Sequence, residues 1–200
     1  MIVVDIETTG LNPWRNSIVS IGAIDFFNPE NQFYGECKIW PGAAIDSFAL
    51  EVNGFSVEEV TDPMKESLGN LLLRFFEWAG KIKFRILAGH NTWFDVSFLR
   101  AAAEKCRIPW IFPIRVIDLH SEGFTNHIKK GFDIPFNNNK PDLTSSYIHS
   151  FAGLPAEPKP HNALTGAKME AESLSRLIYG KGLLEEFSSF PVPDHLIKED

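Results

Sequence analysis

The sequence contains few cysteines, fewer basic than acidic residues, and no long apolar run. Two cysteines among 200 residues, Cys37 and Cys106, cannot form a disulfide framework or a zinc knuckle, so we expect a reduced intracellular setting. Lysine and arginine number 19 against 26 aspartates and glutamates, and the formal charge of −7 argues against a general nucleic-acid coat protein. No apolar stretch approaches the roughly 20 residues of a membrane span, and acids follow the opening Met1–Val4 at once, unlike a signal peptide. We therefore expect a soluble, cytoplasmic protein without a membrane partner.

Aromatic residues are abundant, with 17 phenylalanines and 5 tryptophans, and 44% of the chain is hydrophobic. A chain of this length and composition is typical of one globular domain that is stable without disulfide bonds or other cross-links. We expect this domain to span residues 1–180. Residues 181–200 carry Pro191, Pro193 and an acidic end, and we expect them to form a C-terminal tail.

Hydrophobic periodicity and turn residues predict the following elements. Strands are expected at 1–7, 17–27, 32–39, 85–89 and 115–118, and helices at 63–79, 91–105, 142–151 and 161–179. Residues 129–141 are rich in Asn, Lys and Pro, and we expect an irregular loop there. Three successive strands followed by alternating helices and strands indicate an α/β domain with a mixed sheet covered by helices.

Two carboxylates lie close together near the end of the first expected strand. Because side chains alternate between the faces of a strand, Asp5 and Glu7 point the same way, about 6.5–7 Å apart. Adjacent carboxylates that lose hydration repel each other unless a cation joins them, and oxygen ligands suit Mg²⁺ or Mn²⁺ better than zinc. The pair indicates a divalent metal site; the alternative is a strand end that emerges into solvent.

A third carboxylate, Asp95, falls in the first turn of the helix expected over 91–105. Asn91 is a candidate N-cap, and an acid in the first turn is stabilised by the helix dipole. Asp95 also borders the apolar stripe that contains Phe94 and Phe98, so we expect it to lie beside the core. Asp118, just after an expected strand, is most simply a helix cap.

A histidine, His161, precedes the last long helix. A lone histidine in such a position is more often a cap or a surface residue than a base. An unperturbed imidazole titrates near neutral pH, however, and can take a proton from water if it lies beside a metal site.

Together these segments resemble the three motifs of DEDDh-type 3′–5′ exonucleases, the DnaQ-like group that includes polymerase proofreading subunits, ribonuclease T and oligoribonuclease. The residues that carry the resemblance are Asp5-Ile6-Glu7-Thr8-Thr9-Gly10, then His90-Asn91, Phe94-Asp95 and Phe98-Leu99, then His161, Ala163 and Ala167. It covers about residues 1–180, with the motifs in order. The resemblance implies a ribonuclease H-like α/β fold with a five-stranded mixed sheet flanked by helices.

The resemblance also implies roles for the site residues. Asp5, Glu7 and Asp95 become ligands of two divalent ions, Mg²⁺ or Mn²⁺, and His161 becomes the general base. In such a site the two metals activate a water and stabilise the leaving oxygen of a phosphodiester. The implied partners are the 3′ end of single-stranded DNA or RNA, the nucleoside monophosphate product, and a polymerase subunit.

One position departs from the family pattern, because the fourth acidic ligand is expected five residues after the histidine and this chain has Gly166 there. Glu170 lies one turn later, and helix side chains lean toward the N-terminus, so it can reach back over the glycine. At about 100° per residue, Glu170 falls on the flank of Gly166, and Glu172 falls on the opposite flank, in solvent. We expect Glu170 to replace the missing ligand. The alternatives are that Glu170 is a surface acid, that activity is naturally lost, or that the sequence was altered to trap substrate.

The segment Phe48–Phe55 resembles the family's loop that receives the 3′-terminal nucleotide. Its apolar Leu50 and Phe55 are suited to wedge and stack bases, which is sequence-tolerant recognition. We also expect Thr8, Asn53 and Asn91 to contact substrate. The sequence does not separate DNA from RNA, because contacts to the 2′-hydroxyl come from loops.

The function that these patterns favour is a metal-dependent 3′–5′ exonuclease that acts on single-stranded ends by a two-metal mechanism. The alternative is a weakened or inactive nuclease-fold module that binds nucleic-acid ends or a polymerase, and Gly166 is the residue that favours it. Fold alone does not decide between them, since function lies in the site.

Overall fold

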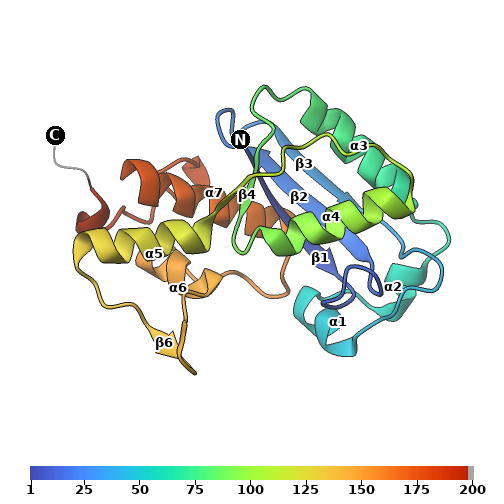
Figure 1. The fold of residues 1–200 in the computed structure, drawn as a ribbon, viewed down its shortest axis with the longest axis horizontal. Coiled ribbons are helices and arrows are strands. Elements are labelled where there is room, and N and C mark those ends of the chain that lie inside the picture. Colours follow the sequence, from blue (N-terminus) through green and yellow to red (C-terminus); the bar gives the residue numbers. More distant parts are fainter. Residues whose placement is uncertain (198–200) are drawn as a thin grey trace.

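The apolar N-terminus forms the central strand β1 (Ile2–Thr8) of a five-stranded sheet in the computed structural model, which describes residues 1–197 (Figure 1). The other strands are β2 (Ile18–Asp25), β3 (Gln32–Glu36), β4 (Leu87–Gly89) and β5 (Val116–Asp118). Their order is β3-β2-β1-β4-β5. The first three strands are antiparallel, and β4 and β5 are parallel to β1. The predicted α/β fold with a five-stranded mixed sheet is therefore confirmed.

Helices cover both faces of this sheet (Figure 1). They are α1 (Ser47–Asn53), α2 (Val57–Thr61), α3 (Leu68–Gly80), α4 (Trp93–Lys105), α5 (Leu119–Lys130), α6 (Ser145–Phe151) and α7 (Ala163–Tyr179). Residues of α3 and α4 pack with one face of β1 and β2, whereas residues of α5, α6 and α7 pack on the opposite face.

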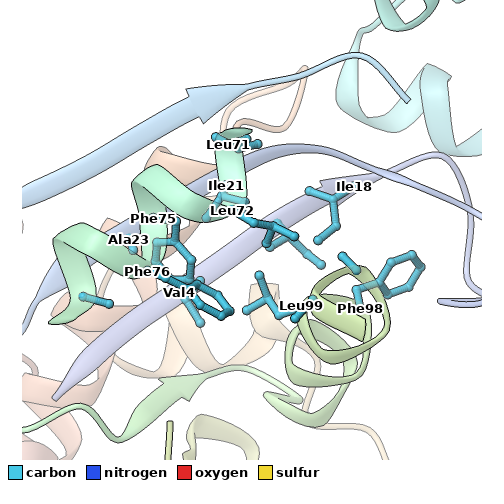
Figure 2. Packing of buried hydrophobic residues seen from close by; sticks show 14 of the residues in the cluster. Val4, Ile18, Ile21, Ala23, Leu71, Leu72, Phe75, Phe76, Phe98 and Leu99 are labelled. Atoms are coloured by element: carbon cyan, nitrogen blue, oxygen red, sulfur yellow. The ribbon is translucent and has the colours of Figure 1, made fainter. Parts of the chain in front are cut away.

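The larger core lies between the sheet and the helices α3 and α4. Figure 2 shows Val4 and Ile21 of the sheet beside Leu72 and Phe76 of α3 and Leu99 of α4. Buried aromatic rings contact one another in this layer, where Phe75 lies edge-to-face with Phe76 and stacks on Phe112. The packing fixes α4 against β1, and this contact sets the position of the helix that carries Asp95.

The alternation of β1 directs its acids to one face. Ile2, Val4 and Ile6 belong to the core beneath α3 and α4, and Val3 belongs to the core beneath α7. Because side chains of a strand alternate, Asp5 and Glu7 lie on the face of Val3, toward α7. The sequence prediction that the two acids share a face is confirmed.

The segment expected to be an irregular loop, 129–141, is more regular than predicted. Its first two residues end α5, and the strands β6 (Phe136–Asn137) and β7 (Lys140–Pro141) pair as a hairpin that projects from the domain (Figure 1). Asn138 and Asn139, with φ of 50° and 61°, make its turn. Asparagine tolerates this left-handed conformation, which two-residue hairpin turns require. The prediction of an irregular loop was wrong for this reason.

The expectation that Glu172 faces solvent was also wrong. Its side chain is fully buried and pairs with Arg176, which is 1% exposed, at 2.7 Å between Oε1 and Nε. The backbone N–H groups of Leu183 and Leu184 each donate to Glu172 Oε2 at 2.8 Å. The segment that follows α7 therefore covers the polar flank of this helix, which the sequence pattern had assigned to solvent.

The described part of the expected tail packs against the domain. Leu184 and Leu196 are buried with residues of α7, and Arg176 donates to the carbonyl oxygens of Phe187 and Phe190. Residues 198–200 lie outside the described residues, and the domain boundary at 180 stays a prediction. Among residues 1–197, no helix is both long and apolar enough to cross a membrane.

Candidate active site

Asp5 lies in the middle of β1, below the beginning of α7. It pairs in register with Gly22 of β2, and a Cβ added at Gly22 would overlap the backbone of Ala163 and Leu164. Glycine is thus required at position 22 for α7 to begin so close to the sheet. Glu7 follows on the same face, and its side chain is 9% exposed.

Asp95 reaches the same region from the first turn of α4, as predicted, and is 4% exposed. The N-cap of this helix is Thr92 rather than Asn91, so that prediction was wrong. The backbone N–H of Thr92 donates to Asp118 Oδ2 at 2.8 Å, a cap supplied by the neighbouring strand. Asp118 also caps α5, as predicted, by accepting from Ser121 N at 3.3 Å.

Glu170 extends from α7 toward the end of β4 and is 7% exposed, which excludes a surface acid. A Cβ at Gly89 would lie 3.1 Å from Glu170 Oε2, so the glycine leaves room for the carboxylate. This Oε2 atom is buried without a hydrogen-bond partner among the described residues. A buried charged oxygen without a partner is costly, and it calls for a cation or a proton.

The four carboxylates perturb one another's pKa values. Burial, and next the charges of Glu170 and Asp95, raise the pKa of Asp5 well above its usual range. Burial, and next the charge of Asp95, do the same for Glu170. Burial likewise raises the pKa of Asp95. Hydrogen bonds from the backbone N–H groups of Asp95 and Ile6 lower this pKa and so offset part of the increase. Burial, and next Glu157, raise the pKa of Glu7 to about 8. These mutual effects place Asp5, Glu7, Asp95 and Glu170 within electrostatic range of one another.

Gly166 lies directly over Asp5. A Cβ at this position would overlap the Asp5 carboxylate, with Asp5 Cγ 3.0 Å away. The Asp5 side chain therefore occupies the place where a side chain at position 166 would begin. Glu170 reaches the same region from one turn further along α7.

His161 lies just before α7, with its side chain 34% exposed. Its backbone N–H donates to Val52 O of α1 at 3.0 Å, which joins two segments far apart in the sequence. Its Nδ1 atom lies 3.7 Å from Glu157 Oε2, and the Glu157 side chain is only 12% exposed. The sequence analysis missed Glu157, although its position four residues before the histidine was visible.

The segment expected to receive the terminal nucleotide is helix α1 rather than a loop. Asp46 caps its start by accepting from Phe48 N, and Gly54 ends it with a left-handed φ of 76°. The buried amide of Asn53 donates to Thr8 O at 3.0 Å, and Thr8 Oγ1 donates to Gly10 O at 2.7 Å. These contacts fix α1 at the end of β1, beside the carboxylates.

A groove of about 730 Å³ opens along α1, and Leu50 and Phe55 line it. Leu50 is nearly buried against Val19 and Val60, whereas Phe55 is half-buried. Asn91 is exposed at the start of the second motif, with a left-handed φ of 54°. Leu50 and Phe55 therefore line the same groove, whereas Asn91 does not line it.

The donor set fits a divalent cation, although no group of three or more His, Cys, Asp or Glu side chains among residues 1–197 is already arranged to hold one. Four carboxylates with raised pKa values, three of them buried, supply hard oxygen ligands of the kind that Mg²⁺ and Mn²⁺ prefer. The unpartnered Glu170 Oε2 is the clearest sign that the cluster lacks a positive partner. Asp5, Glu7, Asp95 and Glu170 are the residues that would hold the ions.

The fold is shared with solved exonuclease structures. The nuclease domain of 3′hExo, a DEDDh family member bound to rAMP, has a TM-score of 0.68 at 16% identity and covers 92% of this chain and 94% of that one. E. coli exonuclease I in complex with a dA16 oligonucleotide has a TM-score of 0.70 at 17% identity over 90% of this chain and 40% of that one. These likenesses define a ribonuclease H-like exonuclease fold.

The sequence identifies the family. The ribonuclease T family model, described as an exonuclease, matches residues 2–172. The chain belongs to this family, in the DnaQ-like group of 3′–5′ exonucleases.

Two curated relatives illustrate how far this similarity extends. The PolC-type DNA polymerase III of Caldanaerobacter subterraneus is 36% identical over 105 residues, 52% of this chain and 7% of the polymerase. Ribonuclease T of Vibrio campbellii is 28% identical over 122 residues, 54% of this chain and 56% of the enzyme. The chain therefore matches only part of the length of either relative.

Proposed function

We propose that this protein removes nucleotides from the 3′ end of single-stranded DNA or RNA, by hydrolysis of the terminal phosphodiester with two divalent cations, Mg²⁺ or Mn²⁺. The observation that supports the proposal is the mutual electrostatic influence of four carboxylates from β1, α4 and α7. Glu7, Asp95 and Glu170 are buried, and Glu170 has an unpartnered oxygen. Membership of the exonuclease family supports the same reaction.

Each acid has a distinct place in the proposed site. Asp5 and Glu7 present carboxylates from a rigid central strand, and Asp95 adds one from the start of α4. Glu170 supplies the fourth in place of the acid that Gly166 lacks. When bound, the two cations would polarise the attacking water and stabilise the charge on the leaving oxygen.

His161 is the proposed general base. Its imidazole is partly exposed beside the cluster, and a neutral ring nitrogen there can take the proton of the attacking water. The nucleoside monophosphate would leave after the bond breaks, and the shortened strand would present its next 3′ end.

The groove along α1 is the proposed place of the 3′-terminal nucleotide. Leu50 and Phe55 offer apolar surface to a base, and stacking of this kind tolerates any sequence. The hydrogen bond from Asn53 to Thr8 O holds α1 against β1, and this contact fixes the position of the groove relative to the carboxylates. Asn91, at the exposed start of the second motif, is proposed to contact the strand itself.

The test is cleavage of 5′-labelled single-stranded DNA and RNA of equal sequence, in the presence of Mg²⁺, Mn²⁺ or EDTA. We expect a ladder of products shortened from the 3′ end, release of mononucleotides, and no cleavage in EDTA. His161→Ala should lower kcat by about 10²–10⁴-fold. Retained binding of both strands without cleavage by the parent would establish the alternative, a binding module.

The partner of such a module is also a proposal. The PolC-type relative is a polymerase in which the matching segment is 7% of the chain, so a polymerase subunit is the candidate partner. Co-elution of the purified protein with a polymerase from its own source checks this part, and separate elution contradicts it.

A further inference from the structure

Glu157 is an acid beside the site that the family motifs do not include, and its side chain is only 12% exposed. It lies in the segment between α6 and α7, and its carboxylate faces both His161 and the carboxylate cluster. Its Oε2 atom is 3.7 Å from His161 Nδ1, and its Oε1 atom is buried with no hydrogen-bond partner among residues 1–197. A surface acid would have neither property.

The backbone around Glu157 is held at both ends. Leu154 N donates to His149 O at 2.8 Å at the end of α6, and His161 N donates to Val52 O at 3.0 Å. Pro158 directly follows Glu157 and restricts it to extended conformations. The side chain is therefore presented to the imidazole by a fixed segment and not by a free loop.

We propose that Glu157 is a positioning residue for His161: its carboxylate accepts the Nδ1 proton of the imidazole and so leaves Nε2 free to take a proton from the attacking water. This inference rests on the proposed function, because it assigns a partner to the proposed base. A carboxylate on one ring nitrogen fixes the tautomer and the orientation of the ring, which is how acids support histidines in other sites.

The distance is consistent with this role. A separation of 3.7 Å is an ion-pair contact, and a movement of about 1 Å brings the atoms to hydrogen-bond length. Glu157 is also the charge that most affects Glu7, so its carboxylate lies near that acid of the cluster. Glu157 thus lies between the base and the cluster, and its effect must be separated from that of a metal ligand.

The first experiment is a double-mutant cycle with Glu157→Gln, His161→Ala and the double variant, and with the exposed Glu104→Gln of α4 as control. We expect Glu157→Gln to lower kcat by about 10–100-fold while KM and the metal concentration for half-maximal rate stay unchanged. In the His161→Ala background, the same substitution should have no further effect. A loss that persists without His161, or a shift in the metal requirement, would overturn the proposal.

The second experiment does not depend on activity. Nitrogen NMR of the His161 side chain, without added metal, should show the Nδ1–H tautomer in the parent and in Glu104→Gln, and a larger Nε2–H population in Glu157→Gln. Identical tautomer populations in all three proteins would overturn the proposal. If the parent cleaves no substrate, the proposed function fails, and the NMR comparison still decides whether Glu157 sets the state of the imidazole.

Discussion

The carboxylate of Asp5 occupies the space that a Cβ atom at position 166 would need. Because residue 166 is glycine, the Asp5 carboxylate can lie directly against the helix at this point. An aspartate there could not coexist with the present Asp5 conformation, so the acid that Gly166 lacks cannot simply be added back. Glu170, one turn later and longer by one methylene than aspartate, supplies a carboxylate without that overlap.

Replacing Gly166 with alanine should therefore impair the site more than the fold. Alanine favours the helix by about 1 kcal/mol, which offsets part of the strain, but its methyl group must displace Asp5. We expect at least about a tenfold loss of kcat, with a melting temperature within a few degrees of the parent.

The matched control is Gly80→Ala, at the exposed end of α3, where the added Cβ would meet no described atom beyond its chain neighbours and the backbone of its own helix within 4 Å. That variant should keep full activity. Equal cleavage rates for Gly166→Ala and the parent would show that the position of Asp5 is not critical.

Glu170→Gln separates the charge of this side chain from its size. The neutral amide removes a buried charge, so the free energy of unfolding without metal should rise. Cleavage should fall by at least about 10²-fold, and the metal concentration for half-maximal rate should increase. Steady-state kinetics across a metal titration check this, with Glu104→Gln as the exposed control. An unchanged rate would leave the proposed fourth ligand without support.

The raised carboxylate pKa values predict how stability depends on pH. The pKa of Glu7 is about 8 in the folded protein and 4.5 in its ordinary state, so between these values the folded protein binds more protons than the unfolded chain. Its contribution is therefore absent below pH 4.5 and becomes increasingly destabilising as the pH rises toward about 8. In EDTA, we expect the free energy of unfolding to fall by on the order of 2–4 kcal/mol across this range.

His149 acts in the opposite direction, since burial lowers its pKa from 6.5 to about 4. The unfolded chain then binds the extra proton, so stability rises with pH between these two values. The comparison with Glu7→Gln isolates the acid, because that variant keeps His149. Urea unfolding of both proteins in EDTA should show a smaller decline for Glu7→Gln, and Mn²⁺ should reduce the decline of the parent. Parallel profiles for the two proteins contradict the prediction.

Arg176→Met should destabilise the whole domain. Glu172 and Arg176 form a buried ion pair, and removal of the cation leaves a buried carboxylate. The expected cost is on the order of 3–5 kcal/mol, and the segment that contains Phe187 and Phe190 should become sensitive to proteases. Thermal unfolding and limited proteolysis measure both effects, with the exposed Arg115→Met as control. A melting temperature equal to that of the control would contradict this reading of the pair.

The sequence predicted the strands of the five-stranded sheet and the helices α3, α4, α6 and α7, because their periodicity reflects burial on the two faces of the sheet. It did not predict the 12-residue helix α5, although Asp118 was recognised as a helix cap. The shared face of Asp5 and Glu7 and the place of Asp95 followed from that regularity. Helix α1 was missed because seven residues carry little periodicity, and its existence depends on the caps Asp46 and Gly54. Short elements are determined by their ends more than by their pattern.

Contacts that cross the fold could not be predicted in the same way. The burial of Glu172 depends on amides from the segment after α7, and the burial of Glu157 depends on the path between α6 and α7. A helical projection shows which residues share a flank, but it does not show what covers that flank. The roles of the site residues in catalysis stay predictions until the variants above are measured.

The hydrogen bond from His161 N to Val52 O links the backbone of the histidine directly to helix α1. Gly54 lies against Pro160 in the same place, so side-chain packing reinforces the backbone contact. A displacement of α1, such as a base entering the groove would cause, is therefore transmitted to the imidazole. If His161 is the base and the groove receives the terminal nucleotide, as proposed, filling of the groove is expected to affect the position of the imidazole.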